Sequence, residues 1–206
     1  MNLTSEVNHL LERFAAQYFY GEAVGVYLIK LPDQLLLFDL PSYSSPLEAY
    51  LTSFNKPISC LLSHGSCGIA DGYIWQQKIN LQIYLHQADQ TSEWLQIKPD
   101  VLFTAPPKFA DNLEIVFTPG HTPGSVCLYE STTKTLFTGD TFGGLANGEI
   151  NDFLDGAGFN GDLNQRFHSC QKLLKYDFEN VLPFHYQMIL GNANSSFKKF
   201  LSKHYQ

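Results

Sequence analysis

Apolar and polar residues follow one another along the chain in short blocks that predict a mixed α/β protein. Residues 24–30 and 34–39 are apolar runs separated by a Leu-Pro-Asp turn, which is typical of a β-hairpin. Further strand-like runs cover residues 58–62, 81–86, 113–119, 125–131, 133–140 and 179–184. The polar, glycine-rich segment 142–162 has no period, and this predicts a long loop.

Helical spacing predicts the elements between these strands. Val7, Leu10, Leu11 and Phe14 recur at this spacing and predict a first helix near residues 5–18. The sequence SSPLEAYLTSF predicts a second helix, with Ser45 as N-cap, Pro46 in the first helical position and Glu48 completing a capping box. Further helices are predicted around residues 73–77, 167–174 and 197–201.

The predicted strands form two sets, over residues 24–86 and 113–184, and each set is accompanied by helices. Two sheets packed together with helices outside is the layered arrangement that buries all of these apolar faces. We therefore expect a four-layer αββα sandwich of two mixed β-sheets. With no internal repeat and no linker in the sequence, a single domain over residues 1–206 is expected.

Composition narrows the partners and the compartment. The formal net charge of −7 argues against nucleic acid or an anionic membrane as the main partner. The four cysteines form no C-x-x-C pair, the N-terminus mixes charges into its apolar positions, and no apolar run approaches the about 20 residues that span a bilayer. We expect a cytoplasmic protein with reduced thiols that takes a small-molecule substrate or ligand.

Four polar residues stand where strand-like runs end, namely His64, His121, Asp140 and His185. If these strands point the same way, the four side chains gather at one edge of the sheets. Imidazole nitrogens and carboxylate oxygens are ligands of zinc, iron and manganese. A single histidine at a strand end is usually a capping or hydrogen-bonding residue, so the spacing alone leaves both the metal site and this structural interpretation open.

Three segments carry a resemblance to a known family. TPGHTPGSV at residues 118–126, LFTGDT at residues 136–141 and VLPFH at residues 181–185 resemble motifs of the metallo-β-lactamase superfamily. Asp39, at the end of the early hairpin, resembles the aspartate that closes the family's opening strands. The resemblance implies the αββα sandwich with a metal site at one edge. It also implies kinship with glyoxalase II-like thioesterases, lactonases, β-lactamases and flavodiiron proteins.

This sequence departs from the family in the H-x-H-x-D-H motif. Its first histidine falls on His64, but Ser66, Gly68 and Ile69 stand where the second histidine, the aspartate and the last histidine belong. Phe184 likewise replaces the glycine that usually precedes the late histidine.

These departures limit the metal content that the resemblance implies. The first metal of the family's dinuclear site would keep His64 and His121, the second would keep only His185, and Asp140 would remain as the bridge. We therefore expect at most one divalent ion, zinc, iron or manganese, held by His64, His121 and Asp140 with His185 as a fourth ligand.

Two functions agree with this ligand set. The first is a divergent hydrolase that cleaves an ester, thioester or lactone bond with water bound to the metal. The second is a non-catalytic relative without a metal, whose former active-site edge binds a small molecule. Ser66, Cys67 and Tyr186 are candidate pocket residues, and no catalytic residue beyond the metal ligands is assigned. The loop at residues 142–162 is either a lid over this edge or an ordinary surface loop.

Overall fold

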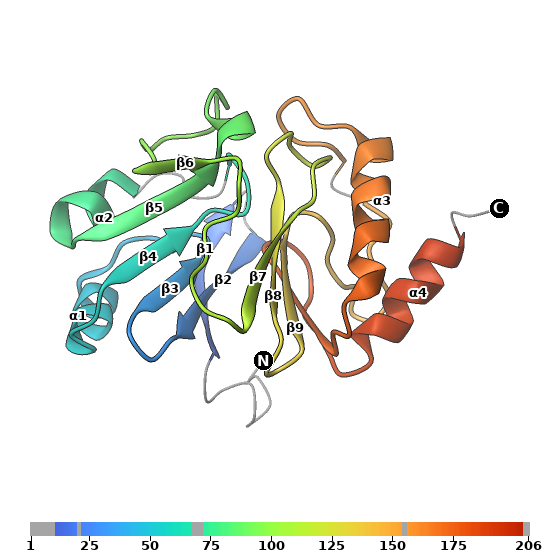
Figure 1. Cartoon of the computed structure of the whole chain (residues 1–206), viewed down its shortest axis with the longest axis horizontal. Coiled ribbons are helices and arrows are strands. Elements are labelled where there is room, and N and C mark those ends of the chain that lie inside the picture. The colour runs from blue at the N-terminus through green and yellow to red at the C-terminus, as the bar shows by residue number, and fades with distance from the viewer. Residues whose placement is uncertain (1–10, 20–21, 67–71, 154–155, 204–206) are drawn as a thin grey trace. The chain divides into compact units, whose positions relative to one another are not determined.

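The computed structural model describes residues 11–19, 22–66, 72–153 and 156–203. The chain divides into two units, Met1–Ala105 and Pro106–Gln206. Each unit holds one β-sheet and its own helices (Figure 1). The predicted α/β class, with two mixed sheets flanked by helices, is thereby confirmed, whereas the single domain stays a prediction. Among the described residues, no helix is both long enough and apolar enough to cross a bilayer.

The first unit contains a six-stranded sheet in the order β1-β2-β3-β4-β5-β6. Its strands are β1 (Leu11–Phe19), β2 (Glu22–Lys30), β3 (Leu35–Phe38), β4 (Ile58–Leu61), β5 (Leu81–His86) and β6 (Val101–Phe103). The first three strands are antiparallel, and β3 to β6 are parallel. Every residue of β3 and β4 is buried, as expected for parallel strands in the middle of a sheet.

The predicted first helix is wrong over residues 11–18. These residues form β1, which pairs antiparallel with β2 from Leu11 opposite Ile29 to Phe19 opposite Glu22. The nine-residue strand pairs with β2 along its length, so tertiary pairing overrides the helical spacing of a few apolar residues. The remainder of the predicted helix, residues 5–10, lies outside the described residues.

The helices of the first unit are α1 (Ser45–Ser53) and α2 (Gly72–Lys78), with a short 3-10 turn, η2 (Gln87–Asp89). The N-cap of α1 is Ser44, whose side chain accepts from the Leu47 N–H, and not Ser45 as predicted. With the cap one residue earlier, Glu48 is too far along the helix for a capping box. Its carboxylate accepts a hydrogen bond from the Tyr43 hydroxyl instead.

The second unit contains a five-stranded sheet in the order β11-β10-β9-β8-β7. Its strands are β7 (Leu113–Phe117), β8 (Val126–Glu130), β9 (Thr135–Gly139), β10 (Asn180–Pro183) and β11 (Ile189–Leu190). β9 and β10 are parallel, and the other neighbours are antiparallel. Since β8 runs against both β7 and β9, the strands β7, β9 and β10 all point the same way.

Two helices cover this second sheet, α3 (Leu163–Lys172) and α4 (Ala193–Lys203), and a 3-10 turn, η3 (Leu173–Lys175), extends α3 (Figure 1). Their buried faces meet the sheet in one apolar core, where the rings of Phe142 and Phe197 stack with centroids 4.8 Å apart. In the described part of segment 142–162, the only β-bridges join Gly144 to Ile150 and to Gln187. The predicted long loop is therefore confirmed.

The turn between β8 and β9 is closed by a buried carboxylate. Glu130 accepts hydrogen bonds from the backbone N–H groups of Thr132 and Thr133, from the Thr133 hydroxyl and from the Asn112 amide. Burial acts to raise the pKa of Glu130, but the hydrogen bonds from Thr133 and Thr132 outweigh it and hold this pKa below its ordinary value of 4.5.

Candidate metal centre

Three of the four predicted ligands lie together in the second unit. His121 stands in the turn after β7, Asp140 follows β9 directly, and His185 follows β10 closely. Because these three strands point the same way, their carboxyl ends lie at one edge of the sheet. The sequence predicted this gathering from the strand ends, and the structure shows how strand direction produces it.

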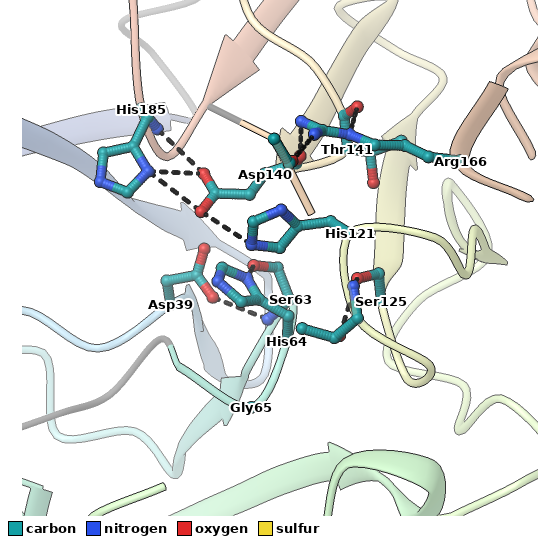
Figure 2. Close-up of polar contacts among 12 residues, drawn as sticks. Asp39, Ser63, His64, Gly65, His121, Ser125, Asp140, Thr141, Arg166 and His185 are labelled. Atoms are coloured by element: carbon teal, nitrogen blue, oxygen red, sulfur yellow. Dashed lines mark hydrogen bonds and ion pairs between the residues drawn. The ribbon is translucent and has the colours of Figure 1, made fainter. Parts of the chain in front are cut away.

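The carboxylate of Asp140 lies between two imidazole rings (Figure 2). The Nδ1 atom of His185 lies 2.9 Å from Oδ1 and 3.0 Å from Oδ2 of Asp140. On the other side, Nε2 of His121 lies 3.4 Å from Oδ2. His121 and Asp140 are buried, while the side chain of His185 keeps 18% of its surface exposed. Two imidazoles and one carboxylate are residue types that can bind a divalent metal ion.

The turn that carries His121 is closed by its own backbone and by a serine. The N–H of Gly120 donates to the Thr122 carbonyl (3.0 Å), and Ser125 accepts from the Thr122 N–H at its hydroxyl (2.9 Å). Gly120 has a φ of +140°, which a side chain rarely tolerates. A Cβ atom there would lie 2.1 Å from the backbone of Arg166, so only glycine lets this turn approach α3.

Helix α3 and its N-cap hold the same turn from outside. The hydroxyl of Ser169 donates to the Pro119 carbonyl (2.6 Å), and the N–H of Asp162 donates to the Gly120 carbonyl (2.8 Å). Asp162 is also the N-cap of α3, since its side chain accepts from the Gln165 N–H (2.9 Å). These contacts fix the backbone on which the His121 imidazole is mounted.

Behind the site, the two ligand-bearing turns are tied to each other. The hydroxyls of Thr118 and Thr141, which precede His121 and follow Asp140, lie 3.1 Å apart and share a hydrogen bond. The hydroxyl of Thr118 also bonds the thiol of Cys127 (3.4 Å). Burial raises the pKa of this thiol to about 11, so Cys127 is a structural partner rather than a nucleophile.

Part of the glycine-rich loop lies directly against His121. The N–H of Gly158 donates to the His121 carbonyl (2.7 Å), and a Cβ atom on Gly158 would lie 2.9 Å from Nε2 of the same histidine. The loop therefore forms a wall beside the imidazole nitrogen that faces Asp140. Which of its two predicted roles the loop has, a lid or an ordinary surface loop, stays a prediction.

In the first unit, His64 follows β4 and Asp39 follows β3 at the carboxyl edge of the parallel strands. Asp39 accepts from the N–H of Ser63 (2.7 Å), and the hydroxyl of Ser63 lies 2.9 Å from Nδ1 of His64 (Figure 2). His64 is buried. The contact at Nδ1 leaves Nε2 as the nitrogen through which His64 would bind a metal.

Two other polar residues near this edge have structural contacts. Asp89 accepts from the N–H of Gly65 (2.8 Å), which fixes the loop after His64. Nδ1 of His86 accepts from the Ala88 N–H (3.2 Å) and caps η2. Burial lowers the pKa of His86, and the charge of Asp89 opposes this shift.

The three candidate pocket residues differ in what the structure says of them. Ser66 is half-buried in the turn after His64, whereas Cys67 lies outside the described residues, as do Gly68 and Ile69. Tyr186 has a φ of +70°, and its ring stands edge-on to the neighbouring His185 ring, with centroids 6.4 Å apart. Their role as pocket residues stays a prediction.

Known proteins resemble this chain in fold and, over part of its length, in sequence. Residues 109–185 match the model of the metallo-beta-lactamase superfamily. A hydroxyacylglutathione hydrolase of Brucella ovis is 31% identical over 81 residues, which are 39% of this chain and 28% of that protein. The match thus spans little more than a quarter of the relative's length.

Two solved structures extend the likeness to nearly the whole chain. A metallo-beta-lactamase from Pontibacter korlensis superposes with a TM-score of 0.71 at 18% identity, over 98% of this chain and 97% of that one. The protein TTHA1623, solved in a di-iron-bound form, gives a TM-score of 0.61 at 22% identity, over 84% of this chain and 92% of that one. The chain therefore has the fold of the metallo-β-lactamases and, over residues 109–185, the sequence pattern of that superfamily.

Proposed function

We propose that this protein is a metal-dependent hydrolase that binds one divalent ion through His121, Asp140 and His185, with His64 as a further ligand. The observation that carries the proposal is the position of the Asp140 carboxylate, within 3.4 Å of one imidazole and 2.9 Å of another at the carboxyl edge of three strands. A buried carboxylate held in this way is suited to bind a cation.

His64 joins the ligand set on the basis of the sequence motif. It occupies the position of the first histidine of H-x-H-x-D-H, and Ser63 engages its Nδ1 atom. A hydrogen bond to one imidazole nitrogen fixes the tautomer and turns the other nitrogen toward a metal. Ser66, Gly68 and Ile69 supply none of the remaining motif ligands, which supports one ion and not two.

The chemistry expected of the site is hydrolysis of a small molecule. A bound zinc, iron or manganese ion would supply a Lewis acid that lowers the pKa of water to about 7. His121, Asp140 and His185 would hold this ion, since the Asp140 carboxylate lies beside a ring nitrogen of each histidine.

Esters, thioesters and lactones are the substrate classes that we propose for this site. Thioesters come first, because the Brucella ovis relative, which is 31% identical over 81 residues, is named a hydroxyacylglutathione hydrolase. The rival function is a non-catalytic protein that binds a small molecule at the same edge. It is favoured by the three motif positions that carry no metal ligand.

Metal content per chain distinguishes the two functions. We expect protein purified without a polyhistidine tag or chelator to contain about one equivalent of zinc, iron or manganese by mass spectrometry. His121→Ala should lose this metal, whereas His168→Ala, at an exposed position on α3, should keep it. Two equivalents would contradict the single-ion assignment. No metal after incubation with excess zinc would end the hydrolase proposal and favour the non-catalytic one.

A further inference from the structure

Arg166 on α3 is a buried cation whose guanidinium reaches three backbone carbonyl groups. Its Nε atom donates to the Thr141 carbonyl (2.8 Å), Nη2 donates to the Asp140 carbonyl, and Nη1 donates to the Gly156 carbonyl (Figure 2 shows the first two contacts). One side chain thus joins the turn that carries Asp140 to the glycine-rich loop. The guanidinium also lies over the ring of Phe153, 4.4 Å from its centroid.

The backbone of the same residue contacts the other ligand-bearing turn. A Cβ atom on Gly120 would lie 2.1 Å from the Arg166 N and Cα atoms, so the turn that precedes His121 rests on α3 at this position. Gly158, two residues after the carbonyl that Nη1 contacts, lies against His121. Arg166 therefore touches each of the segments that fix His121 and Asp140.

Packing alone does not account for an arginine here. Burying a guanidinium costs free energy unless its donors are satisfied, and an apolar residue fills a core position at lower cost. Of the next residues on this buried face, Cys170 and Leu173 are apolar, and Ser169 is a small residue that donates to the Pro119 carbonyl. What an arginine adds is a rigid fork of donors that can hold several carbonyl groups at fixed relative positions.

We propose that Arg166 is a positioning residue of the metal centre, which sets where the Asp140 carboxylate lies relative to His121 by holding the backbone of Asp140 and Thr141 against the glycine-rich loop. This inference rests on the proposed function, because the ligands that Arg166 positions are those of the proposed metal site. The proposed role depends on the position of the hydrogen-bond donors of Arg166. An experiment can separate this role from the effect of the positive charge of the side chain.

The sign of the effect separates the two contributions. A positive charge beside the site repels a metal ion, so removing the charge alone would strengthen zinc binding. Removing the donors lets Asp140 shift, which would weaken zinc binding. Changes in partners that orient metal ligands typically cost 10–100-fold in metal affinity. If positioning dominates, Arg166→Lys, which keeps the charge but loses the fork, should weaken binding about 10–100-fold, as should Arg166→Met.

The test measures zinc affinity by competition with a chromophoric chelator and the visible spectrum of the Co²⁺ form, on protein shown to be folded by circular dichroism. Lys172→Met is the matched control, since Lys172 is a cation on the same helix whose ammonium lies over Phe117. We expect weaker zinc binding and an altered Co²⁺ spectrum in both Arg166 variants and neither change in the control. If Arg166→Lys has the zinc affinity and the Co²⁺ spectrum of the wild type, the proposal is overturned. This holds even if Arg166→Met fails to fold.

A metal-free measurement keeps this proposal distinct from the hydrolase proposal. The ¹⁵N resonances of the His185 ring report its hydrogen bond to Asp140, 2.9 Å long at Nδ1. We expect them to shift in Arg166→Lys and to stay unchanged in Lys172→Met. If the wild-type protein bound no metal, the hydrolase proposal would fail. The positioning role of Arg166 would be overturned by a different result, namely unshifted His185 resonances in Arg166→Lys.

Discussion

Replacing Gly120 by alanine is expected to destabilise the second unit more than any ordinary Gly→Ala change. Two costs add at this position. The φ of +140° is a conformation that residues with a side chain adopt at a cost of about 1–3 kcal/mol. The new Cβ would also lie 2.1 Å from backbone atoms of Arg166, and overpacking of this kind costs a further about 1–3 kcal/mol.

Relief of this contact requires movement of a helix. The obstructing atoms are N and Cα of a residue inside α3, and not the end of a flexible side chain. To restore an ordinary contact, α3 or the turn must move until the separation grows from 2.1 Å to at least 3.4 Å. We therefore expect Gly120→Ala to lower the free energy of unfolding by about 2–6 kcal/mol, against the total of about 5–15 kcal/mol typical of a folded protein.

Gly148→Ala is the matched control in the same unit. Its φ of +79° is also positive, but among the described residues no heavy atom lies within 4 Å of a Cβ at this position. Backbone strain alone should cost about 1–2 kcal/mol there. Urea unfolding followed by circular dichroism gives both values, provided that the denaturant slope is unchanged. Equal losses in the two variants would refute the argument that the His121 turn rests on the backbone of α3.

Three further outcomes are expected. The pKa of Glu130 is lower in the folded protein than in the unfolded chain, so its carboxylate stabilises the fold above about pH 4.5, and this contribution is lost as the pH falls through the lowered pKa. Glu130→Gln should therefore lower the free energy of unfolding by about 1–3 kcal/mol at pH 7, measured by urea unfolding. A difference between variant and wild type that does not shrink at pH 3 would contradict this. Ser169→Ala should cost about 1–3 kcal/mol by removing the buried bond to the Pro119 carbonyl, and a loss no larger than that of His168→Ala would count against it. A thiol reagent at pH 8 should leave the thiols of Cys60, Cys127 and Cys170 unmodified until urea is added, because burial raises the pKa of each. Rapid modification of more than one thiol in the native protein would exclude this.

Local patterns in the sequence predicted most elements of this fold. Continuous apolar runs bounded by turn residues gave the strands from β2 to β5 and from β7 to β10, because such runs leave few alternatives to a buried strand. The strands β6 and β11 were missed, since three and two residues carry no measurable period. β1 was mistaken for a helix, because its pairing with β2 is a long-range property that apolar spacing does not encode.

The residues of the candidate site were likewise found only in part from the sequence. His121, Asp140 and His185 were found from their positions after strands, and the parallel direction of β9 and β10 brings the last two together. Arg166 was not singled out, because a cation on an amphipathic helix ordinarily faces solvent. Its place on the buried face, in step with Ser169, Cys170 and Leu173, is the signal that could have marked it.

The sequence by itself determined which residue types could bind a metal and at which strand ends they stand, because ligand chemistry and strand periodicity are local properties. Only the tertiary structure decided that one carboxylate lies between two imidazoles and that a buried arginine holds its backbone. Those contacts join residues 19 to 45 positions apart. They depend on strand direction and helix packing, which follow from the burial of whole faces and not from any short stretch of residues.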